Sequence, residues 1–271
     1  MNGFVTLAPN TSRPRPLELE YAWVEPEQPA DNSPTLVFLH EGLGCAALWR
    51  SFPAALCKRL HWRGLVYSRF AYGASTPRPH DEPFPSDYLE REALDILPAL
   101  LRELDIARPW LLGHSDGGSI ALIAAGNDAA RYRGIITLAP HHCVEDICLA
   151  GIARARIAYE QGDLRQRLAK YHRDADSAFY GWCDAWLDPR RRDWRIDRAV
   201  LERITCPALA IQGTRDEYAT LDQIEALERH APQTELRVIG DCGHFPFRDA
   251  AAIVTDAIAD FVARHSIRIL E

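Results

Sequence analysis

Short apolar runs alternate along the chain with longer segments in which apolar residues recur at helical spacing. Strands that are apolar on both faces are typical of a parallel sheet that helices cover on both sides. The pattern therefore predicts an α/β fold with a mostly parallel, doubly wound sheet. Six runs have the length of such strands: TLVFLH (35–40), GLVYSR (64–69), PWLLGH (109–114), GIITLAP (134–140), PALAIQG (207–213) and ELRVIG (235–240).

Three further segments have the periodicity of helices. Residues 87–105 place apolar side chains on one face, and Pro98 is expected to kink this helix. The segment DGGSIALIAAG (116–126) is apolar nearly all round, which predicts a helix buried against the sheet. A closing helix is predicted from the apolar residues Ile253, Val254, Ala257, Ile258, Phe261 and Val262.

Residues 141–204 break the alternation, because they have helical spacing and many aromatic residues but no strand-like run. We predict an α/β core formed by residues 1–140 and 205–271, with a helical cap inserted at 141–204 over the carboxyl edge of the sheet. Charges within the insertion nearly cancel, so its run PRRRDWR is interpreted as a solvated loop. The proline-rich run TPRPHDEPFP, which begins at Thr76, is interpreted as an ordered surface loop.

Composition narrows the class of protein. The chain has 271 residues, of which 47% are hydrophobic and 25% charged, as expected for a globular protein with one sizeable core. A net charge of -7 and a pI near 5.8 argue against a nucleic-acid partner, which would need a basic surface. No run of about 18 apolar residues occurs, and the first twenty residues do not resemble an export signal. We therefore expect neither a membrane span nor secretion.

Cysteine usage also argues against secretion. Seven cysteines are scattered without the spacing of a disulfide framework, which fits a reducing cytoplasm. Most of them are expected to be small buried apolar residues. The run HHCVEDIC (141–148) holds residue types that bind metals, but its spacing matches no standard zinc pattern. We therefore expect a cytoplasmic protein that binds no metal and no cofactor.

The segment GHSDG (113–117) has the G-x-S-x-G pattern at the point where a predicted strand ends and a predicted helix begins. A serine on so sharp a turn has a strained backbone, and the flanking glycines remove side chains that would clash. The helix behind it directs free N–H groups and its positive dipole end toward the same point. Ser115 is therefore the candidate nucleophile.

A serine hydroxyl needs a base, and the base needs an acid that orients it. The run GTRDEY ends one predicted strand and offers Asp216, and the run DCGHFP ends the next and offers His244. Open α/β sheets gather their sites at the carboxyl ends of strands, where both residues fall. Asp216 is favoured as the acid, with Glu217 or the pair Glu145 and Asp146 as alternatives.

With the chain order serine, aspartate, histidine, the sequence resembles the serine hydrolases of the α/β-hydrolase fold over essentially its whole length. The resemblance implies an eight-stranded, mostly parallel sheet with a cap inserted between its sixth and seventh strands. It also implies the reaction. Ser115 attacks an acyl carbon, His244 moves the proton, Asp216 orients the imidazole, and water then cleaves the acyl-enzyme.

The resemblance further implies where the oxyanion of the tetrahedral intermediate is bound. One donor is the backbone N–H of Asp116, directly after the nucleophile. The other lies in the turn after the first predicted strand, where family members often have His-Gly-X and this chain has His40, Glu41 and Gly42. The matching donor is the N–H of Gly42. Glu41 stands where glycine is usual, so the turn can be shaped differently here.

Electrostatics restricts the direction of the Glu41 side chain. Two charges about 4 Å apart repel by roughly 4 kcal/mol at an effective dielectric near 20, so an ionised Glu41 aimed at the oxyanion would oppose catalysis. Two directions remain open. The side chain turns away to bond a loop or to pair with a base such as Arg69, or it lines the substrate pocket and contacts a polar or cationic group.

The expected partner is a small-molecule substrate. Trp182 and Trp186 are four residues apart and share a helix face, which either lines an apolar pocket or belongs to the core. We expect an ester, lactone or thioester with a small apolar or aromatic acyl part. Aminopeptidases and carbon–carbon bond hydrolases use the same triad, and a non-catalytic ligand-binding member of the fold is a third alternative. The sequence does not predict the oligomeric state.

Overall fold

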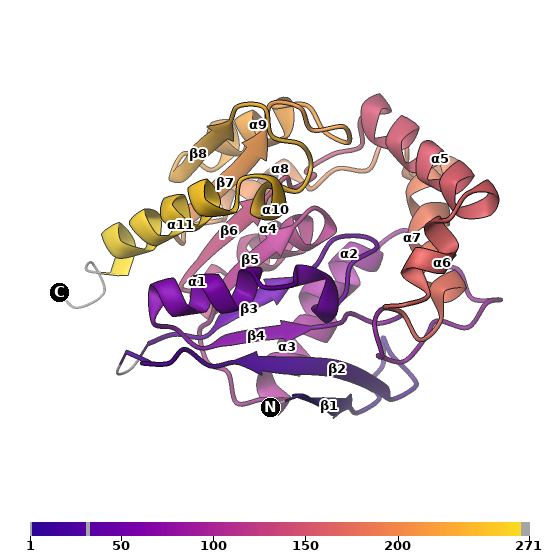
Figure 1. Ribbon diagram of the computed structural model, residues 1–271, viewed down its shortest axis with the longest axis horizontal. Coiled ribbons are helices and arrows are strands. Elements are labelled where there is room, and N and C mark those ends of the chain that lie inside the picture. The colour runs from indigo at the N-terminus through magenta and orange to yellow at the C-terminus, as the bar shows by residue number, and fades with distance from the viewer. Residues whose placement is uncertain (1, 31–32, 267–271) are drawn as a thin grey trace.

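The computed structural model describes residues 2–30 and 33–266, and at its centre lies an eight-stranded sheet (Figure 1). The strand order is β1-β2-β4-β3-β5-β6-β7-β8. Strand β2 pairs antiparallel with β1 and with β4, and all the other neighbours pair parallel. The predicted mostly parallel α/β sheet is confirmed. The strands are β1 (Asn2–Leu7), β2 (Leu17–Val24), β3 (Leu36–Leu39), β4 (Gly64–Tyr67), β5 (Trp110–His114), β6 (Gly134–Leu138), β7 (Ala208–Gly213) and β8 (Thr234–Ile239).

The six predicted apolar runs overlap the strands β3 to β8. Strands β3 to β7 are buried along their whole length, which explains why their sequences are apolar throughout. Strands β1 and β2 lie outside the predicted runs. In β2 the buried residues Leu17 and Leu19 alternate with more exposed ones, as in a strand with a single buried face. A search for continuous apolar runs misses such strands.

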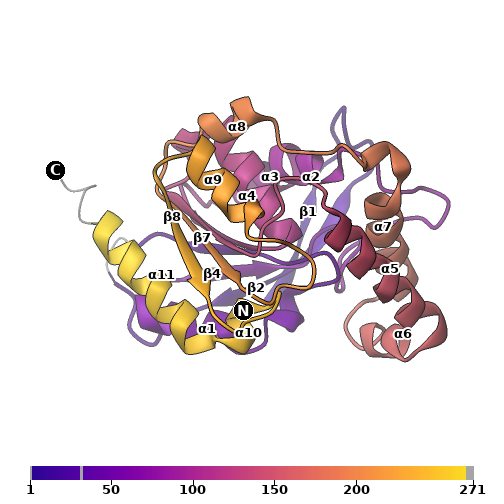
Figure 2. The same ribbon diagram turned by 90° about the horizontal axis from the view of Figure 1, so that it is seen from above.

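Helices cover both faces of the sheet (Figure 2). Helices α1 and α11 lie on one face, where they bury Trp110 and Phe261, and α2, α3, α4 and α9 lie on the other, where they bury Ile120 and Leu227. The helices are α1 (Phe52–Leu60), α2 (Tyr88–Arg91), α3 (Leu97–Glu103), α4 (Asp116–Asn127), α5 (Asp146–Gln161), α6 (Leu164–Leu168), α7 (Ala175–Leu187), α8 (Arg198–Glu202), α9 (Asp222–His230), α10 (Pro246–Asp249) and α11 (Ala251–Ser266), with the 3₁₀ turns η1 (Ala46–Trp49), η3 (Ala129–Arg131) and η4 (Pro189–Arg191).

The three predicted helices are present, with two differences in detail. Helix α4 is buried from Asp116 to Gly126, as its sequence predicts. In α11 the side chain of Ile253 is 48% exposed, so the apolar face of this helix is narrower than its sequence suggests. In the segment 87–105 a π-helical turn, η2 (Glu92–Ile96), directly precedes α3. Pro98 has no N–H and crowds the preceding turn, and a π-helical turn accommodates this change in hydrogen bonding.

Residues 141–204 contain the helices α5 to α8 and no named strand. Helices α5, α6 and α7 are grouped at one end of the sheet (Figure 1). The division of the chain into a core and a cap stays a prediction.

The run PRRRDWR is wrongly interpreted as wholly solvated. Arg190 is exposed, but Arg191 is only 1% exposed. The Arg191 guanidinium lies over three aromatic rings, 5.0 Å from the centroid of Tyr88, 5.1 Å from Trp186 and 4.3 Å from Trp194. Trp194 belongs to the run itself, but Tyr88 and Trp186 come from α2 and α7, so the burial of Arg191 depends on segments outside the run.

All seven cysteines are unpaired, and all except Cys143 are buried, in agreement with their interpretation as small core residues. None of the helices within the described residues combines the length and the apolar character that a membrane span requires.

Candidate active site

Ser115 occupies the sharp turn between β5 and α4. Its backbone, with φ 53° and ψ −117°, is in a region that a non-glycine residue occupies only under strain. Tight packing explains the flanking glycines. A Cβ on Gly113 would lie 2.1 Å from the Gly117 carbonyl oxygen, and one on Gly117 would lie 1.9 Å from the Leu39 carbonyl oxygen. Larger residues at either position would push the turn at residues 113–117, here called the nucleophile elbow, away from the sheet.

The three predicted catalytic residues meet in one chain of hydrogen bonds. His244 follows β8, and its Nε2 lies 3.0 Å from Ser115 Oγ. On the opposite side of the ring, His244 Nδ1 lies 2.8 and 2.9 Å from the carboxylate oxygens of Asp216, which follows β7. All three side chains are buried. In this arrangement an imidazole can take a proton from the serine while the carboxylate fixes the tautomer of the ring.

Backbone donors hold the Asp216 carboxylate in place. Its Oδ1 accepts hydrogen bonds from the N–H groups of Tyr218 (2.9 Å) and Ala219 (3.1 Å). Burial raises the pKa of Asp216, but the hydrogen bond and charge of His244, together with the Tyr218 N–H, outweigh burial and lower the pKa below its usual value. The carboxylate therefore stays ionised beside the imidazole.

The alternative acids have other partners. Glu217 Oε2 accepts a hydrogen bond from the backbone N–H of His244 at 3.1 Å, so it contacts the histidine loop and not the ring. Glu145 accepts a hydrogen bond from the N–H of Thr220 at 3.0 Å. Asp146 is exposed on the surface. The geometry favours Asp216 over these residues.

The two predicted oxyanion donors belong to α4 and to the turn after β3. Asp116 is the first residue of α4, so its N–H has no acceptor within the helix. The carbonyl oxygen of Glu41 accepts hydrogen bonds from His40 Nδ1 (2.7 Å) and Arg69 Nη2 (3.0 Å). Because a trans peptide points its N–H away from its C=O, these bonds set the direction of the Gly42 N–H.

Both residues of this turn suit their positions. Glu41 lies outside the left-handed region that favours glycine, so its side chain brings no backbone strain. A Cβ on Gly42, in contrast, would lie 2.0 Å from the indole nitrogen of Trp182. Glycine at this position therefore allows α7 to pack directly over the turn.

The Glu41 carboxylate turns toward the elbow. Its Oε2 lies 3.5 Å from His114 Nδ1, and the side chain is 15% exposed. The predicted pairing with Arg69 is wrong, because Arg69 instead contacts the main-chain carbonyl of Glu41. Burial raises the pKa of Glu41, but the contact with His114 and the charges of His114 and His40 outweigh burial and lower the pKa from 4.5 to about 2.

The Asp116 side chain connects the elbow to three other segments. The carboxylate is 1% exposed and accepts hydrogen bonds from the Tyr88 hydroxyl (2.9 Å) and Trp186 Nε1 (3.1 Å). Arg69 Nη2 lies 3.5 Å from the same group. The donors come from α2, α7 and the segment after β4, so this buried carboxylate links α7 to the nucleophile turn.

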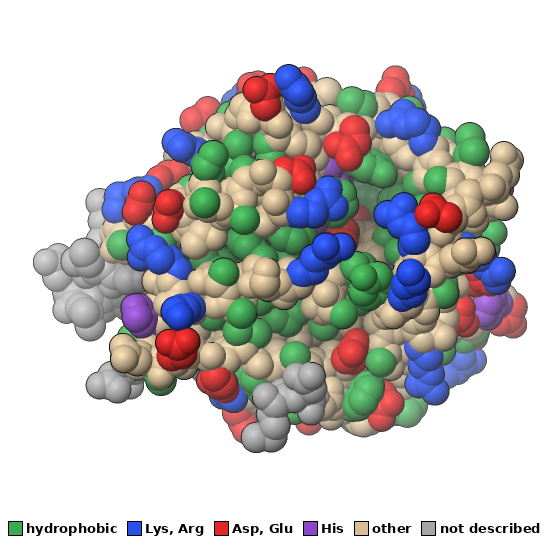
Figure 3. All heavy atoms as spheres, in the orientation of Figure 1, with side chains coloured by type: hydrophobic (Ala, Val, Ile, Leu, Met, Phe, Trp, Pro, Cys, Tyr) green, Lys and Arg blue, Asp and Glu red, His purple; other side chains and the backbone are tan. Residues whose placement is uncertain are grey.

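A cavity of about 80 Å³ adjoins Ser115 and His244. Its walls are mostly apolar and include all three predicted pocket residues, Glu41, Trp182 and Trp186. The molecular surface is hollowed between the sheet and the group of helices α5 to α7, and apolar side chains lie in this hollow (Figure 3). Ligand pockets usually measure about 300 to 1,000 Å³, so this cavity suits only a small chemical group.

Several lining residues are not among the predicted site residues. His141 and Tyr218 line the cavity and follow the carboxyl ends of β6 and β7. The same position in the fold pointed to Asp216 and His244, so the strand-end rule would also have found these two residues. Cys148 reaches the cavity from α5, and its sequence context gives no signal of this orientation.

His141 brings a second imidazole to the site. Its ring centroid lies 5.8 Å from that of His244, and its buried Nδ1 has no hydrogen-bond partner among the described residues. Burial first, and then the charge of His244, lowers the pKa of His141 from 6.5 to about 3, so the ring is neutral. The next residue of the run HHCVEDIC, His142, instead contacts Gln223 at 2.9 Å.

Comparison with known proteins identifies the family. The chain is 29% identical over 184 residues to serine hydrolase BPHL of Homo sapiens, a match that covers 64% of this chain and 60% of that protein. The chain thus matches less than two thirds of the length of this relative. Two of the solved structures that share the fold illustrate the likeness. An esterase from Thermogutta terrifontis has a TM-score of 0.73, 20% identity and coverage of 97% of this chain and 99% of its own. A proline iminopeptidase from Mycobacterium smegmatis has a TM-score of 0.77, 19% identity and coverage of 98% and 100%. Residues 36–257 match the model of the alpha/beta hydrolase family, and the chain belongs to this family.

Proposed function

We propose that this protein is a serine hydrolase that cleaves an ester, lactone or thioester of a small acyl compound through an acyl-enzyme. The observation that carries the proposal is the hydrogen-bonded chain from Ser115 through His244 to Asp216 at the carboxyl edge of the sheet. The name of the matched human relative, a serine hydrolase, supports the same class of reaction.

In the first half of the proposed reaction, Ser115 Oγ attacks the acyl carbon while His244 Nε2 takes the hydroxyl proton. The carbonyl oxygen becomes an oxyanion, to which the N–H groups of Gly42 and Asp116 donate hydrogen bonds. Each such donor contributes about 2.7 to 4 kcal/mol to the stability of the transition state. Collapse of the intermediate breaks the bond to the leaving group, which receives the proton from His244.

In the second half, a water molecule loses a proton to His244 and attacks the acyl-enzyme. The resulting intermediate collapses to the carboxylic acid, and His244 returns the proton to Ser115 Oγ. Asp216 stays ionised throughout and stabilises the imidazolium that forms in each half.

The cavity supports a small, apolar acyl group. Its volume of about 80 Å³ leaves little room next to Ser115, and the indoles of Trp182 and Trp186 form apolar walls. Glu41 lines the cavity, and its carboxylate is directed toward His114. The substrate is thus a small molecule, and the cytoplasmic location stays a prediction.

A fluorophosphonate probe tests the proposal, because it modifies only a serine that an adjacent base activates. We expect covalent labelling of the wild-type chain and none of Ser115→Ala, with kcat lowered by roughly 10⁶-fold on any ester that the wild type cleaves. Ser119→Ala, at a buried serine within α4, is the matched control and should retain labelling.

A panel of nitrophenyl esters, thioesters and lactones that differ in acyl length then ranks the substrates. We expect kcat/KM to fall as the acyl group outgrows the cavity. An unlabelled wild-type chain, alongside a serine hydrolase that does react, would overturn the proposed function.

A further inference from the structure

One buried histidine beside the candidate nucleophile has no part in the proposed reaction. His141 follows β6 and lines the cavity that adjoins Ser115. The residue is 2% exposed, and its ring centroid lies 5.8 Å from that of His244 and 5.3 Å from that of Trp186. His244 alone exchanges a proton with Ser115 in the proposed reaction, so the cavity holds a second imidazole whose use is open.

Neither ring nitrogen of His141 has a hydrogen-bond partner in the part of the chain that the structure describes, and the two nitrogens differ in access. Nδ1 is fully enclosed, so a ligand cannot reach it. Nε2 is not fully enclosed and keeps accessible surface. Because the residue lines the cavity beside Ser115, this surface opens on that cavity. Nε2 is thus the atom of this ring that a bound molecule can contact.

The main chain of His141 is fixed before any ligand binds. Its carbonyl oxygen accepts a hydrogen bond from Ser119 Oγ at 2.5 Å, and its N–H donates to the same hydroxyl at 3.3 Å. The ring is also confined, because it lies edge-on to the indole of Trp186. A ligand group that bonds Nε2 therefore pays little to order the protein, which favours binding.

The charge of the ring restricts the kind of group that suits Nε2. Burial lowers the pKa of His141 to about 3, so the imidazole is neutral and has one N–H donor and one acceptor nitrogen. Burial that disfavours a charge on the ring also disfavours a charged ligand group at the same place. A hydroxyl is uncharged and both donates and accepts, so it can bond Nε2 in either tautomer of the ring.

The other walls favour a short carbon chain around this hydroxyl. Cys148 and Ile152 of α5 and Trp186 of α7 line the same cavity. Such side chains suit the carbon atoms of a ligand, and a small number of polar groups in an apolar pocket fixes its orientation. The volume of about 80 Å³ limits the chain to a few atoms.

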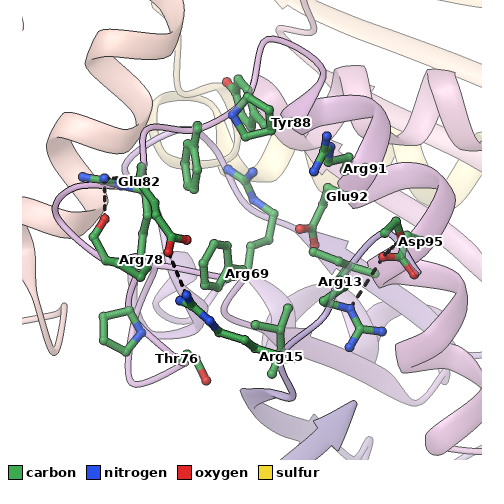
Figure 4. Close-up of a pocket in the computed structure, with 18 of the residues that line it drawn as sticks. Arg13, Arg15, Arg69, Thr76, Arg78, Glu82, Tyr88, Arg91, Glu92 and Asp95 are labelled. Carbon is green, nitrogen blue, oxygen red and sulfur yellow. Dashed lines mark hydrogen bonds and ion pairs between the residues drawn. The ribbon is translucent and has the colours of Figure 1, made fainter. Parts of the chain in front are cut away.

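The larger cavity shown in Figure 4 differs in this respect. It measures about 530 Å³, and several of its ionised side chains pair with one another. Arg15 pairs with Glu82 at 2.9 Å. Arg13 lies 3.6 Å from Asp95. These groups already have partners, whereas His141 Nε2 faces its cavity without one.

We propose that His141 determines substrate specificity by binding, through Nε2, a hydroxyl group on the acyl part of the substrate. The inference rests on the proposed function, which places the acyl group in the cavity beside Ser115. The preferred substrates are then short hydroxyacyl esters, lactones or thioesters. An acyl group without the hydroxyl leaves Nε2 unpaired in an apolar site, so the site discriminates against it.

Matched pairs of esters test the proposal on the wild-type chain. Each enantiomer of ethyl 3-hydroxybutyrate is compared with ethyl butyrate, and each enantiomer of ethyl lactate with ethyl propionate, by titration of the released acid. We expect kcat/KM to be at least about tenfold higher for the hydroxyester in one of the pairs. Hydrolysis of all these esters without such a preference would overturn the inference and leave the proposed function standing.

Variants of the two adjacent histidines then assign the preference to one ring. His141→Leu removes both ring nitrogens at similar volume, so the ratio of kcat/KM between hydroxyester and plain ester should fall to about 1 to 2. His141→Gln keeps a donor and an acceptor, so part of the preference should return. His142→Ala is the matched control, because His142 does not line the cavity, and the ratio should stay unchanged. An undiminished ratio in His141→Leu would contradict the proposal.

Binding to Ser115→Ala separates this inference from the reaction. This variant cannot form an acyl-enzyme, so tryptophan fluorescence, which reports on the indoles of the cavity, measures affinity alone. We expect the preferred hydroxyester to bind at least about tenfold more tightly than its plain partner, and the difference to vanish when His141→Leu is added. A wild-type chain that cleaves no ester while Ser115→Ala keeps this difference would refute the proposed function only. Equal affinities would refute the hydroxyl site, also where His141→Leu fails to fold.

Discussion

At the scale of single residues, the contact between Glu41 and His114 links two loops of the candidate active site. His114 Nε2 lies 2.7 Å from the carbonyl oxygen of His244, and because a carbonyl only accepts, this nitrogen carries a hydrogen. Nδ1 then faces the Glu41 carboxylate at 3.5 Å. Through these two contacts His114 joins the turn that carries Gly42 to the loop that carries His244.

Glu41→Gln should change how stability depends on pH. The folded state lowers the pKa of Glu41 from 4.5 to about 2, so the ionised carboxylate stabilises the fold above pH 4.5 by about 3 kcal/mol. This contribution is lost as the pH falls toward 2. Urea unfolding at pH 6 and pH 3 should show that the wild type loses about 2 kcal/mol more than Glu41→Gln. Parallel losses in the two proteins would contradict the contact.

The choice between neighbouring acids is also testable at this scale. Asp216→Asn keeps the shape of the side chain but removes the charge that fixes the His244 tautomer, so kcat should fall by about 10⁴-fold. Glu217→Gln retains an oxygen that can accept the His244 N–H, and kcat should fall by less than about tenfold. Steady-state kinetics on one ester suffice, and equal losses in the two variants would contradict the assignment of Asp216.

At the scale of elements, α7 forms part of the candidate active site through its packing. Trp182 lies directly over Gly42, and Trp186 donates a hydrogen bond to Asp116, so the helix contacts both residues that supply the proposed oxyanion donors. The position of α7 therefore influences the geometry of both proposed donors as well as the shape of the cavity beside Ser115.

Gly42→Ala should damage catalysis through this contact. The added Cβ would lie 2.0 Å from the Trp182 indole nitrogen, so either α7 or the turn must move. We expect kcat to fall by about 10²- to 10³-fold, as for the loss of one oxyanion donor. Gly240→Ala is the control, since nothing lies within 4 Å of its added Cβ.

A double-mutant cycle separates the clash from other effects of the methyl group. Trp182→Ala removes the obstructing ring, so Gly42→Ala in that background should cost much less activity than in the wild type. The same cost in both backgrounds would show that the indole is not the cause.

The sequence predicts those elements that can be recognised from their own residues. Strands β3 to β7 are recognisable because burial on both faces makes their sequences apolar throughout. Strand β8 overlaps the run ELRVIG but is buried only at its two ends. A search for continuous apolar runs does not find strands β1 and β2, since only one face of each is well buried. The sequence pattern also does not predict the π-helical turn before Pro98. The proline indicates a local disturbance, but its form depends on how the helix packs.

In the candidate site, too, features set by nearby residues are predictable and features set by distant segments are not. Ser115, Asp216 and His244 follow strand ends, a position that the sequence alone reveals. The direction of Glu41 depends on His114, which is far away along the chain, and the burial of Arg191 depends on Tyr88 and Trp186 as well as on nearby Trp194. Contacts with distant segments leave no trace in the surrounding residues.

At the scale of the whole molecule, buried polar groups join residues 141–204 to the rest of the chain. Two of these groups are the Asp116 carboxylate and Arg191, whose guanidinium lies among the rings of Tyr88, Trp186 and Trp194. Arg191 also donates a hydrogen bond to the carbonyl oxygen of Ser86. Removing such a group should loosen the helices above the cavity and destabilise the fold at the same time.

Arg191→Ala should therefore lower the free energy of unfolding by about 2 to 4 kcal/mol, because it leaves a cavity and removes the cation from three aromatic faces. Arg190→Ala, one residue away, changes an exposed side chain and should cost less than about 0.5 kcal/mol. Urea unfolding followed by tryptophan fluorescence measures both variants, since two of the rings around Arg191 are indoles. Equal midpoints for the two variants would mean that Arg191 does not hold these segments together.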